Sequence, residues 1–263
     1  MDISRSSFYY SPKLRDESKL EKAILETAGA WPVYGYRRIT AQLRRDEWVV
    51  NHKRVYRIMH KMGLEGQIKR KKRFTTNSQH PFKRFPNLIK ELGIDHPDQV
   101  WAADITYIRL KSSFVYLAVL MDIFTRGVRG WHLSRSLNQG LVLTSLKKAL
   151  KKGKPEIHHS DQGLQYASGE YIQILKNAQI KISMTDLGAA WQNGYVERLI
   201  RTIKEEEVDL TEYSDYWDAY YRIGNFLEDV YMKRWIHSAL DYLTPFEFEE
   251  DWFGMRSEAF VFS

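Results

Sequence analysis

Hydrophobic and polar positions in the first quarter of the chain repeat at helical spacing. Residues 17–27 place apolar side chains on one helical face, and a second helix is predicted over residues 39–43, after Gly35. A third helix is predicted from Asn51, a typical capping residue, to Met62, with Gly63 closing it. A short helix, a connection and a basic third helix resemble a helix-turn-helix unit.

From residue 99 the pattern changes to runs typical of strands. The predicted strands are Val100 to Leu110, Phe114 to Phe124, Gly127 to Leu133, Ile157 to His159 and Ile180 to Met184. The predicted helices are Asn138 to Lys151, Ser168 to Lys176, Gln192 to Glu206 and residues 214–231, followed by an aromatic-rich tail. A three-strand meander followed by alternating helices and strands predicts an α/β fold, with a mixed sheet and helices on its faces.

These patterns divide the chain into four predicted segments. Residues 1–75 form a helical, helix-turn-helix-like DNA-binding domain, and residues 76–98 form a basic linker interrupted by prolines. Residues 99–210 form the mixed-sheet domain, and residues 211–263 form a C-terminal helix and tail.

The charge of the chain is unevenly spread. The formal net charge is +7, with 40 Lys and Arg against 33 Asp and Glu. Residues 1–97 hold 21 basic and 10 acidic residues, whereas the remaining 166 hold 19 and 23. The basic part predicts a polyanionic partner. The absence of cysteine excludes disulfides and thiolate metal sites. The longest apolar run is far shorter than a membrane span, and no signal-peptide pattern begins the chain, so we expect an intracellular, nucleic-acid-facing protein.

Basic residues in the basic part of the chain, residues 1–97, occur beside apolar ones. On the predicted third helix this spacing lets one face pack while another meets phosphates; a helical bundle with a solvated basic face is the alternative. The dense basic run at residues 69–73 is either a solvated tether or a DNA-tracking strap. The DNA contacts predicted here are Arg37, Arg38, Lys53, Arg54, Arg57, Lys69, Arg70, Lys71, Lys72 and Arg73.

Three carboxylates occupy three different local settings in the second half. Asp104 lies inside a strand-like run, Asp161 lies where a short strand ends, and Glu197 lies in a predicted helix. Hard divalent cations prefer oxygen ligands, and Mg²⁺ is usually held by few carboxylates together with substrate phosphates. Folding that gathers the three acids would therefore create a magnesium site.

Other residues compete for this chemistry. Asp122 also follows an apolar strand, but it lies at the strand's end, where a capping role is the commoner explanation. His158 and His159 precede Asp161; because Mg²⁺ prefers oxygen, we expect both imidazoles to be structural or to contact DNA.

The predicted helix around Glu197 has an edge suited to a phosphodiester. At about 100° per residue, Asn193, Glu197, Arg201 and Lys204 fall within an arc of roughly 80° beside an apolar stripe. A carboxylate for a metal with cations one and two turns further on suits DNA lying across the helix. The alternative is a simple amphipathic helix with a Glu197–Arg201 pair, worth about 0.2–0.5 kcal/mol.

Motifs spread over nearly the whole chain match one known family. They are Tyr34 to Ile39, Val55 to Met59, Trp101 with Asp104 to Ile108, Tyr116 to Val119, His159 to Gly163 with Gln165 and Tyr166, Asn193 with Glu197 and Lys204, and His237 to Leu240 with Leu243 to Pro245. Together they resemble the second-frame (OrfB) region of transposases from the IS-three family of bacterial insertion sequences, within the retroviral-integrase (DDE) superfamily. The resemblance implies an RNase-H-like mixed five-stranded sheet flanked by helices and preceded by a small all-helical helix-turn-helix domain.

The resemblance also implies an activity. The enzyme would cleave and join insertion-sequence ends, using two Mg²⁺ ions, or Mn²⁺ as a substitute, held by the catalytic residues Asp104, Asp161 and Glu197. Lys204 and Arg201 would hold terminal phosphates, with Asn193 a further DNA contact. Trp191 either stacks on a displaced base or belongs to the core. The implied double-stranded DNA partners are the terminal inverted repeats of the element and the target duplex. Because two ends must be held together, the resemblance also implies a dimer or larger assembly on DNA. The implied location is the bacterial cytoplasm, at the nucleoid.

Some features depart from the family's pattern. Gly194 stands where the family usually has Ala, and Arg234 to His237 replaces a usual Arg-Pro-His or Arg-Arg-His. Neither change touches an expected metal ligand. The upstream helix-turn-helix and zipper of the family's first frame are not in this sequence, so we expect a fusion with such a region. Two other functions stay open: a non-catalytic DNA-binding regulator or domesticated relative, and an RNase-H-type nuclease that cuts without joining.

Overall fold

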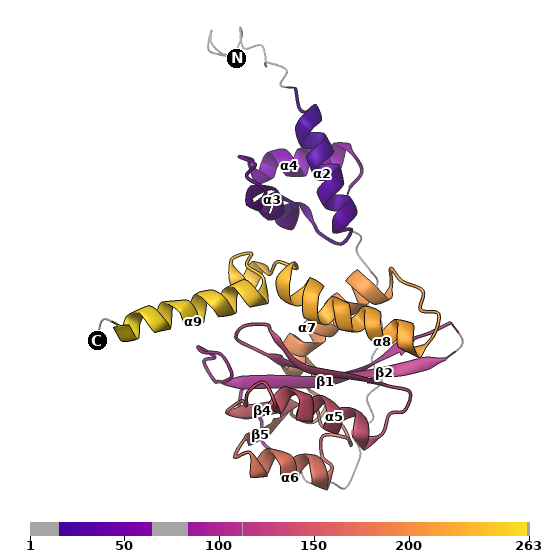
Figure 1. Cartoon of the computed structure of the whole chain (residues 1–263), viewed down its shortest axis with the longest axis vertical. Coiled ribbons are helices and arrows are strands. Elements are labelled where there is room, and N and C mark those ends of the chain that lie inside the picture. Colours follow the sequence, from indigo (N-terminus) through magenta and orange to yellow (C-terminus); the bar gives the residue numbers. More distant parts are fainter. Residues whose placement is uncertain (1–15, 65–83, 112, 262–263) are drawn as a thin grey trace, which may run out of the picture. The chain divides into compact units, whose positions relative to one another are not determined.

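The chain forms two compact units, comprising residues 1–68 and residues 69–263 (Figure 1). The structure, a computed structural model, describes residues 16–64, 84–111 and 113–261. The basic run at residues 69–73 therefore lies outside the described residues. The finer division predicted from sequence, with boundaries after residues 75, 98 and 210, stays a prediction.

The first unit consists, in its described part, of three helices. They are α2 (Ser18–Ala30), α3 (Tyr36–Arg45) and α4 (His52–Lys61). The side chain of Asn51 accepts a hydrogen bond from the backbone N–H of Lys53 at 2.9 Å, which confirms the predicted cap of α4. α3 begins three residues earlier than predicted, because the extended Gly35 precedes it and the helical turn starts at Tyr36. Buried apolar side chains from all three helices form the core: Leu20, Ile24, Ile39, Leu43, Val55 and Ile58.

The second unit is built on the mixed five-stranded sheet that the sequence predicted. Its strands are β1 (Val100–Arg109), β2 (Phe114–Asp122), β3 (Val128–Ser134), β4 (Ile157–Ser160) and β5 (Lys181–Met184). Their order is β3-β2-β1-β4-β5. The first three strands pair antiparallel as a meander, while β4 pairs parallel to β1 and β5 parallel to β4. This order places β1 and β4 side by side at the centre of the sheet.

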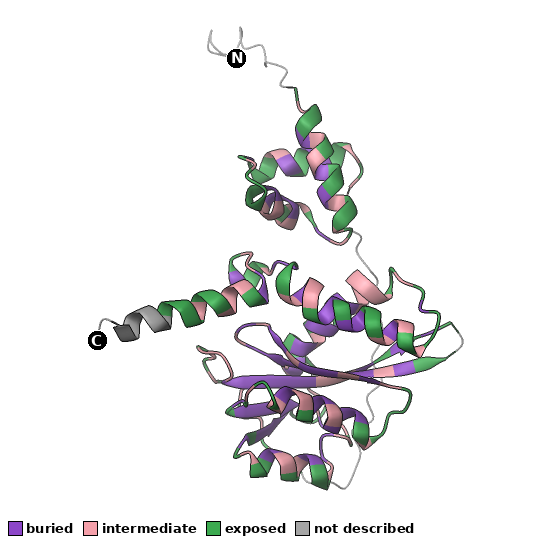
Figure 2. Cartoon of the chain, viewed as in Figure 1, coloured by how far each residue is buried: buried purple, intermediate pink, exposed green. Residues whose placement is uncertain are grey.

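Helices cover both faces of this sheet (Figure 1). The helices with buried faces against the strands are α5 (Gln139–Leu150), α6 (Gly169–Asn177), α7 (Gly194–Ile203) and α8 (Tyr216–Asn225). In Figure 1, α5 and α6 lie on one side of the sheet and α7 and α8 on the other, and Figure 2 shows the strands between them as mostly buried. Trp101 and Ala103 pack in one cluster with residues of α5 and α6. Because side chains alternate along a strand, Asp104 lies on the opposite face, toward α7.

Three predicted elements differ in the structure. The helix predicted at 192–206 is a 3₁₀ turn (Ala190–Asn193), then α7, then a π turn (Lys204–Val208). Likewise α8 continues as a π turn (Phe226–Tyr231). The predicted aromatic-rich tail contains a 17-residue helix, α9 (Pro245–Val261). No helix within the described ranges combines the length and apolar character needed to cross a lipid bilayer.

The sequence did contain a signal for α9. The backbone N–H of Thr244 donates to Glu247 Oε2 at 2.8 Å, and the backbone N–H of Glu247 donates to Thr244 Oγ1 at 3.2 Å. This reciprocal pair is a capping box, and Pro245 occupies the first helical position. The spacing Thr-Pro-x-Glu therefore predicts a helix start at this point.

The end of the predicted linker packs along the edge of the sheet. The backbone N–H of Met184, in β5, donates to the carbonyl oxygen of Pro86 at 3.3 Å, and the backbone N–H of Leu88 donates to Ser183 Oγ at 2.9 Å. Residues 84–90 thus cover part of the free edge of β5 and belong structurally to the second unit.

Candidate active site

The register of the central strands brings two aspartates to the same level of the sheet. Ala103 of β1 is paired with Ser160 of the parallel strand β4. Asp104 directly follows Ala103, and Asp161 directly follows Ser160. The two aspartates therefore lie on neighbouring segments of the sheet, whose usual spacing is about 4.8 Å. The two acids therefore lie next to each other where β4 ends.

Asp104 carries a strongly perturbed carboxyl group. Burial raises its pKa well above the usual range, and the charges of Asp161 and Glu197 raise it further. The backbone N–H of Ile105 donates to Asp104 Oδ1 at 2.7 Å, and this bond and the charge of Lys204 oppose the rise in pKa. Asp104 is therefore a carboxylate in surroundings that favour a bound cation.

Asp161 begins a tight turn directly after β4. Its Oδ1 accepts a hydrogen bond from the backbone N–H of Gly163 at 3.0 Å. A Cβ atom on Gly163 would lie 2.9 Å from that same oxygen, so the turn is shaped around the Asp161 carboxylate.

Glu197 completes the group from the first turn of α7, which packs on β1 and β2. Burial raises the pKa of Glu197, Arg201 opposes that rise, and the charge of Asp161 adds to it. Thus Asp104, Asp161 and Glu197, from three separate elements, are close enough for their charges to interact. In the described part of the chain, however, no three Asp, Glu or His side chains stand close enough together to hold a metal ion.

Asn193 has a structural role that sequence reasoning missed. Its side chain is only 3% exposed, and its Nδ2 donates to the backbone carbonyl of Ala103 at 3.1 Å. The bond joins the start of α7 to β1 one residue before Asp104. Its Oδ1 is buried and has no hydrogen-bond partner among the described residues. Asn193 therefore forms a buried link between the segment that carries Glu197 and the strand that carries Asp104, while its predicted DNA contact stays a prediction.

Tyr166 was named above only as part of a family motif, and no role was assigned to it. Its hydroxyl is buried and makes no hydrogen bond to any described residue. Burial raises the pKa of Tyr166 well above its usual range, and the charges of Tyr171, Asp104 and Asp161 raise it further. The hydroxyl therefore lies near both aspartates.

The charge of Lys204 acts on Asp104, and that of Arg201 acts on Glu197. The ammonium group of Lys204 lies 4.7 Å from the centre of the exposed Tyr107 ring. Arg201 is exposed one turn beyond Glu197. Trp191 is 72% exposed, so the alternative that it belongs to the core is wrong. Stacking of Trp191 on a base stays a prediction.

The competing residues have structural roles. Asp122 is fully buried and accepts backbone N–H bonds from Thr125 at 2.7 Å and from Asp98, which confirms the expected capping role. His158 shares a hydrogen bond with the Tyr171 hydroxyl, and His159 shares one with Ser183 Oγ, each at 2.8 Å. Burial lowers the pKa of His158 to about 3 and that of His159 to about 4, so both imidazoles are neutral core groups.

In the first unit the predicted DNA contacts fall into two groups. Arg37 and Lys53 are exposed. Arg38 lies over the ring of Tyr34, at 5.3 Å from its centre, and Arg54 and Arg57 both bind Glu17.

Comparison with known proteins places the chain in a family. Residues 94–190 and 178–245 both match families described as "Integrase core domain", and residues 14–72 match "HTH-like domain". A transposase for insertion sequence element IS904 from Lactococcus lactis is 34% identical over 82% of this chain and 87% of its own length. The chain belongs to the IS3 family of insertion-sequence transposases.

Further IS3-family relatives match the chain along almost its full length. The "putative transposase InsK" of element IS150 from Escherichia coli is 31% identical over 97% of this chain and 93% of its own. An IS600 "uncharacterized 31 kDa protein" from Shigella sonnei is 30% identical over 97% and 98%. Among solved structures, the HTLV-2 integrase catalytic core domain in complex with magnesium is 20% identical, covers 58% of this chain and 96% of its own, and has a TM-score of 0.45.

Proposed function

We propose that this chain is a DDE-type DNA transposase, a polynucleotidyl transferase that cleaves insertion-sequence ends and joins them to target DNA. The observation that carries the proposal is the mutual electrostatic effect of Asp104, Asp161 and Glu197, contributed by β1, the end of β4 and the start of α7. Groups with raised pKa values that converge from separate elements are typical of catalytic sites. Membership of a transposase family supports the same reaction.

The three carboxylates fit divalent cations chemically. All are hard oxygen donors, and the raised pKa values of Asp104 and Glu197 reflect burial together with repulsion between like charges, which a cation would relieve. Asp104, Asp161 and Glu197, which do not stand close enough in the structure to share an ion, would move together to hold Mg²⁺, or Mn²⁺ in its place. When bound, two such ions supply a more reactive nucleophile and stabilise the charge on the leaving oxygen.

The chain's own residues would position the DNA. Lys204 and Arg201 follow Glu197 along the same helix edge, so they would bind phosphates beside the acids. The exposed indole of Trp191 would stack on a base at the DNA end. The buried bond from Asn193 to Ala103 would keep Glu197 and Asp104 in a fixed relation while the DNA is exchanged.

The first test is strand joining with a labelled duplex that carries the end of the insertion element, in Mg²⁺. We expect joined products from the wild-type chain and none from Glu197→Gln. Glu170→Gln is a matched control, because Glu170 also lies in the first turn of a helix but pairs only with Lys147, at 3.5 Å on the surface. We expect that control to retain joining.

The labelled ends also separate this proposal from its two alternatives. Cut but unjoined products would favour an RNase-H-type nuclease, whereas binding without cutting by any variant would favour a DNA-binding regulator.

Because two ends must be joined together, we propose that the active form is a dimer or larger assembly on DNA at the bacterial nucleoid. We also propose that fusion to an upstream first-frame region adds to end binding.

A further inference from the structure

The basic side chains of α4 fall on two faces with different surroundings. Arg54 Nε and Arg57 Nη2 both bind Glu17 Oε1, at 2.9 and 2.6 Å, and Lys61 Nζ binds Glu21 Oε1 at 3.0 Å. The hydrogen bond from Arg54 lowers the pKa of Glu17, which keeps that carboxylate charged. These three cations therefore tie α4 to the start of α2.

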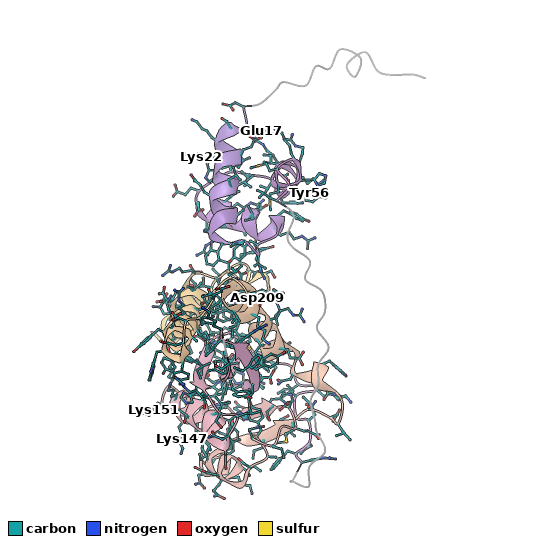
Figure 3. The ribbon with its side chains drawn as sticks, turned by 90° about the vertical axis from the view of Figure 1, so that its right-hand side faces the viewer. Glu17, Lys22, Tyr56, Lys147, Lys151 and Asp209 are labelled. Atoms are coloured by element: carbon teal, nitrogen blue, oxygen red, sulfur yellow. The ribbon has the colours of Figure 1, made fainter. Side chains whose placement is uncertain are left out.

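The neighbouring face of α4 carries an exposed row of polar rings and a cation. At about 100° per residue, Lys53, Tyr56 and His60 fall within an arc of roughly 60°. All three are exposed, with Tyr56 at 52%, and Lys53 forms no ion pair within the described ranges. Figure 3 labels Tyr56 on this helix and Glu17, the residue that precedes α2.

Ring contacts extend this row to the start of α3. The Tyr56 and His60 rings stack with centres 6.1 Å apart, the Tyr36 ring meets the Tyr56 ring edge-on at 5.1 Å, and the Tyr36 and His52 rings lie 6.5 Å apart. We call these four residues the aromatic strip. Arg37 Nε donates to the Tyr36 hydroxyl at 3.1 Å, so a second exposed cation borders the strip.

Charge indicates which partner fits the aromatic strip. Neither α3 nor α4 contains an acidic residue, so no carboxylate from these two helices opposes a polyanion at the strip. A helix of about 10–12 Å diameter fits the major groove of B-DNA, about 12 Å wide. Tyrosine hydroxyls and imidazoles can both donate and accept hydrogen bonds with base edges, while exposed cations bind phosphates. These features favour duplex DNA over an uncharged or basic protein surface.

We propose that the aromatic strip is the base-reading surface of the first unit, with Tyr56 at its centre and with Lys53 and Arg37 as its phosphate contacts. This inference rests on the proposed DNA-end binding and specifies the residues that confer sequence preference. On the adjoining side of α4, Arg54 and Arg57 bind Glu17 and hold the helix in place beside the strip.

The test uses the full-length chain and two probes. One probe is a duplex that the wild-type chain selects from a random-sequence pool, and the other is a shuffled duplex of the same base composition. Tyr56→Ala should reduce the preference for the selected duplex by about tenfold or more and leave binding to the shuffled duplex unchanged. Lys53→Ala should weaken binding to both probes equally and lower the salt dependence by about one counterion.

Two further variants keep the test decisive. Lys22→Ala removes a cation whose side chain is 79% exposed on α2, where it faces Glu26, and should leave the preference unchanged (Figure 3). Tyr56→Phe retains the ring contacts and removes only the hydroxyl. If both Tyr56 variants keep the wild-type melting temperature and both lose the sequence preference, the hydroxyl is the group that reads the bases.

Three results would overturn the inference. They are a wild-type chain that selects no sequence, a Tyr56→Ala variant that keeps the full preference, and a Lys22→Ala variant that loses it. Comparing strand joining by the wild-type chain and by Glu197→Gln tests the proposed function independently of these three results. Joining can proceed on DNA ends supplied at high concentration, even when sequence preference is lost.

Discussion

The side chain of Asn193 donates a hydrogen bond, 3.1 Å long, to the backbone carbonyl of Ala103, and so connects the residue four places before Glu197 to the residue one place before Asp104. The bond is buried, so water cannot replace it readily. It therefore determines how the third acid is placed relative to the first.

Asn193→Ala should lower the rate of strand joining at least tenfold. Loss of a buried hydrogen-bond donor should also cost about 1–3 kcal/mol of unfolding free energy, because the Ala103 carbonyl is left without its partner. Single-turnover joining and urea unfolding measure the two effects. We expect DNA affinity to stay near wild type, which separates a positioning role from a binding role.

Asn177→Ala is the matched control for that variant. Asn177 accepts a hydrogen bond from Gln173 on the exposed end of α6, so its removal should change neither joining nor stability by a measurable amount. Unchanged joining by Asn193→Ala would remove Asn193 from the account of the active site.

Asp104→Asn should abolish joining yet stabilise the metal-free protein at neutral pH. A folded-state pKa raised above the unfolded value means that the fold carries its full penalty above the folded pKa; this penalty shrinks as the pH falls below the folded pKa and is gone below the unfolded pKa. Neutral asparagine removes the penalty at all pH values. A gain of about 1 kcal/mol would raise the melting temperature by roughly 2–4 °C.

Magnesium provides the second half of this comparison. Mg²⁺ should raise the melting temperature of the wild-type chain, with a shift that grows logarithmically once its concentration exceeds the dissociation constant, and should raise that of Asp104→Asn much less. Equal shifts in both proteins would mean that Asp104 is not a ligand. Calorimetry in chelator and in excess Mg²⁺ measures this without any activity assay.

Trp191→Ala should reduce joining without affecting the fold. The indole is exposed in a 3₁₀ turn beside Glu197, and stacking on a base is worth about 1–3 kcal/mol. We therefore expect DNA-end affinity to fall about fivefold or more with an unchanged melting temperature. Trp217→Ala, which removes another exposed indole on α8, is the control, and an equal loss in both variants would contradict a specific role for Trp191.

Arg129→Met should be among the most destabilising single changes outside the active site. Its guanidinium contacts Asp98 at 2.9 Å, Glu249 at 2.6 Å and the fully buried Asp122 at 3.5 Å. Removing the cation leaves buried negative charge uncompensated, which costs about 3–5 kcal/mol. Urea unfolding should show this loss, whereas Arg222→Met, which breaks an exposed pair with Asp218, should cost less than about 1 kcal/mol.

Sequence patterns were sufficient for the sheet because strand periodicity is local. Each predicted strand is present within a few residues of its predicted ends, and the first meander and the later helices follow from chain order. The π turn after α7 could not be predicted, since residues such as Lys204 to Val208 have ordinary helix propensity and tertiary packing decides the hydrogen-bond spacing.

The three acids could be identified from the sequence because each belongs to a distinct motif. The contacts around them could not be identified in this way. Asn193 falls on the polar edge of a helical wheel, and nothing local shows that its amide reaches Ala103, 90 residues away. The pairing of Arg54 with Glu17 is likewise a contact between helices that no periodicity reveals. Residue spacing predicts which side chains share one face of a helix, but not which residues of other elements that face contacts.

The segment at residues 84–90 has a practical consequence for dissecting this enzyme. β5 is an edge strand, and its Met184 N–H is satisfied by Pro86. A catalytic fragment begun at residue 99, where the sheet domain was predicted to start, would leave that edge bare and able to pair with the edge of another copy. Fragments that aggregate on purification are therefore the expected outcome of that boundary, and soluble ones should begin upstream of Pro86.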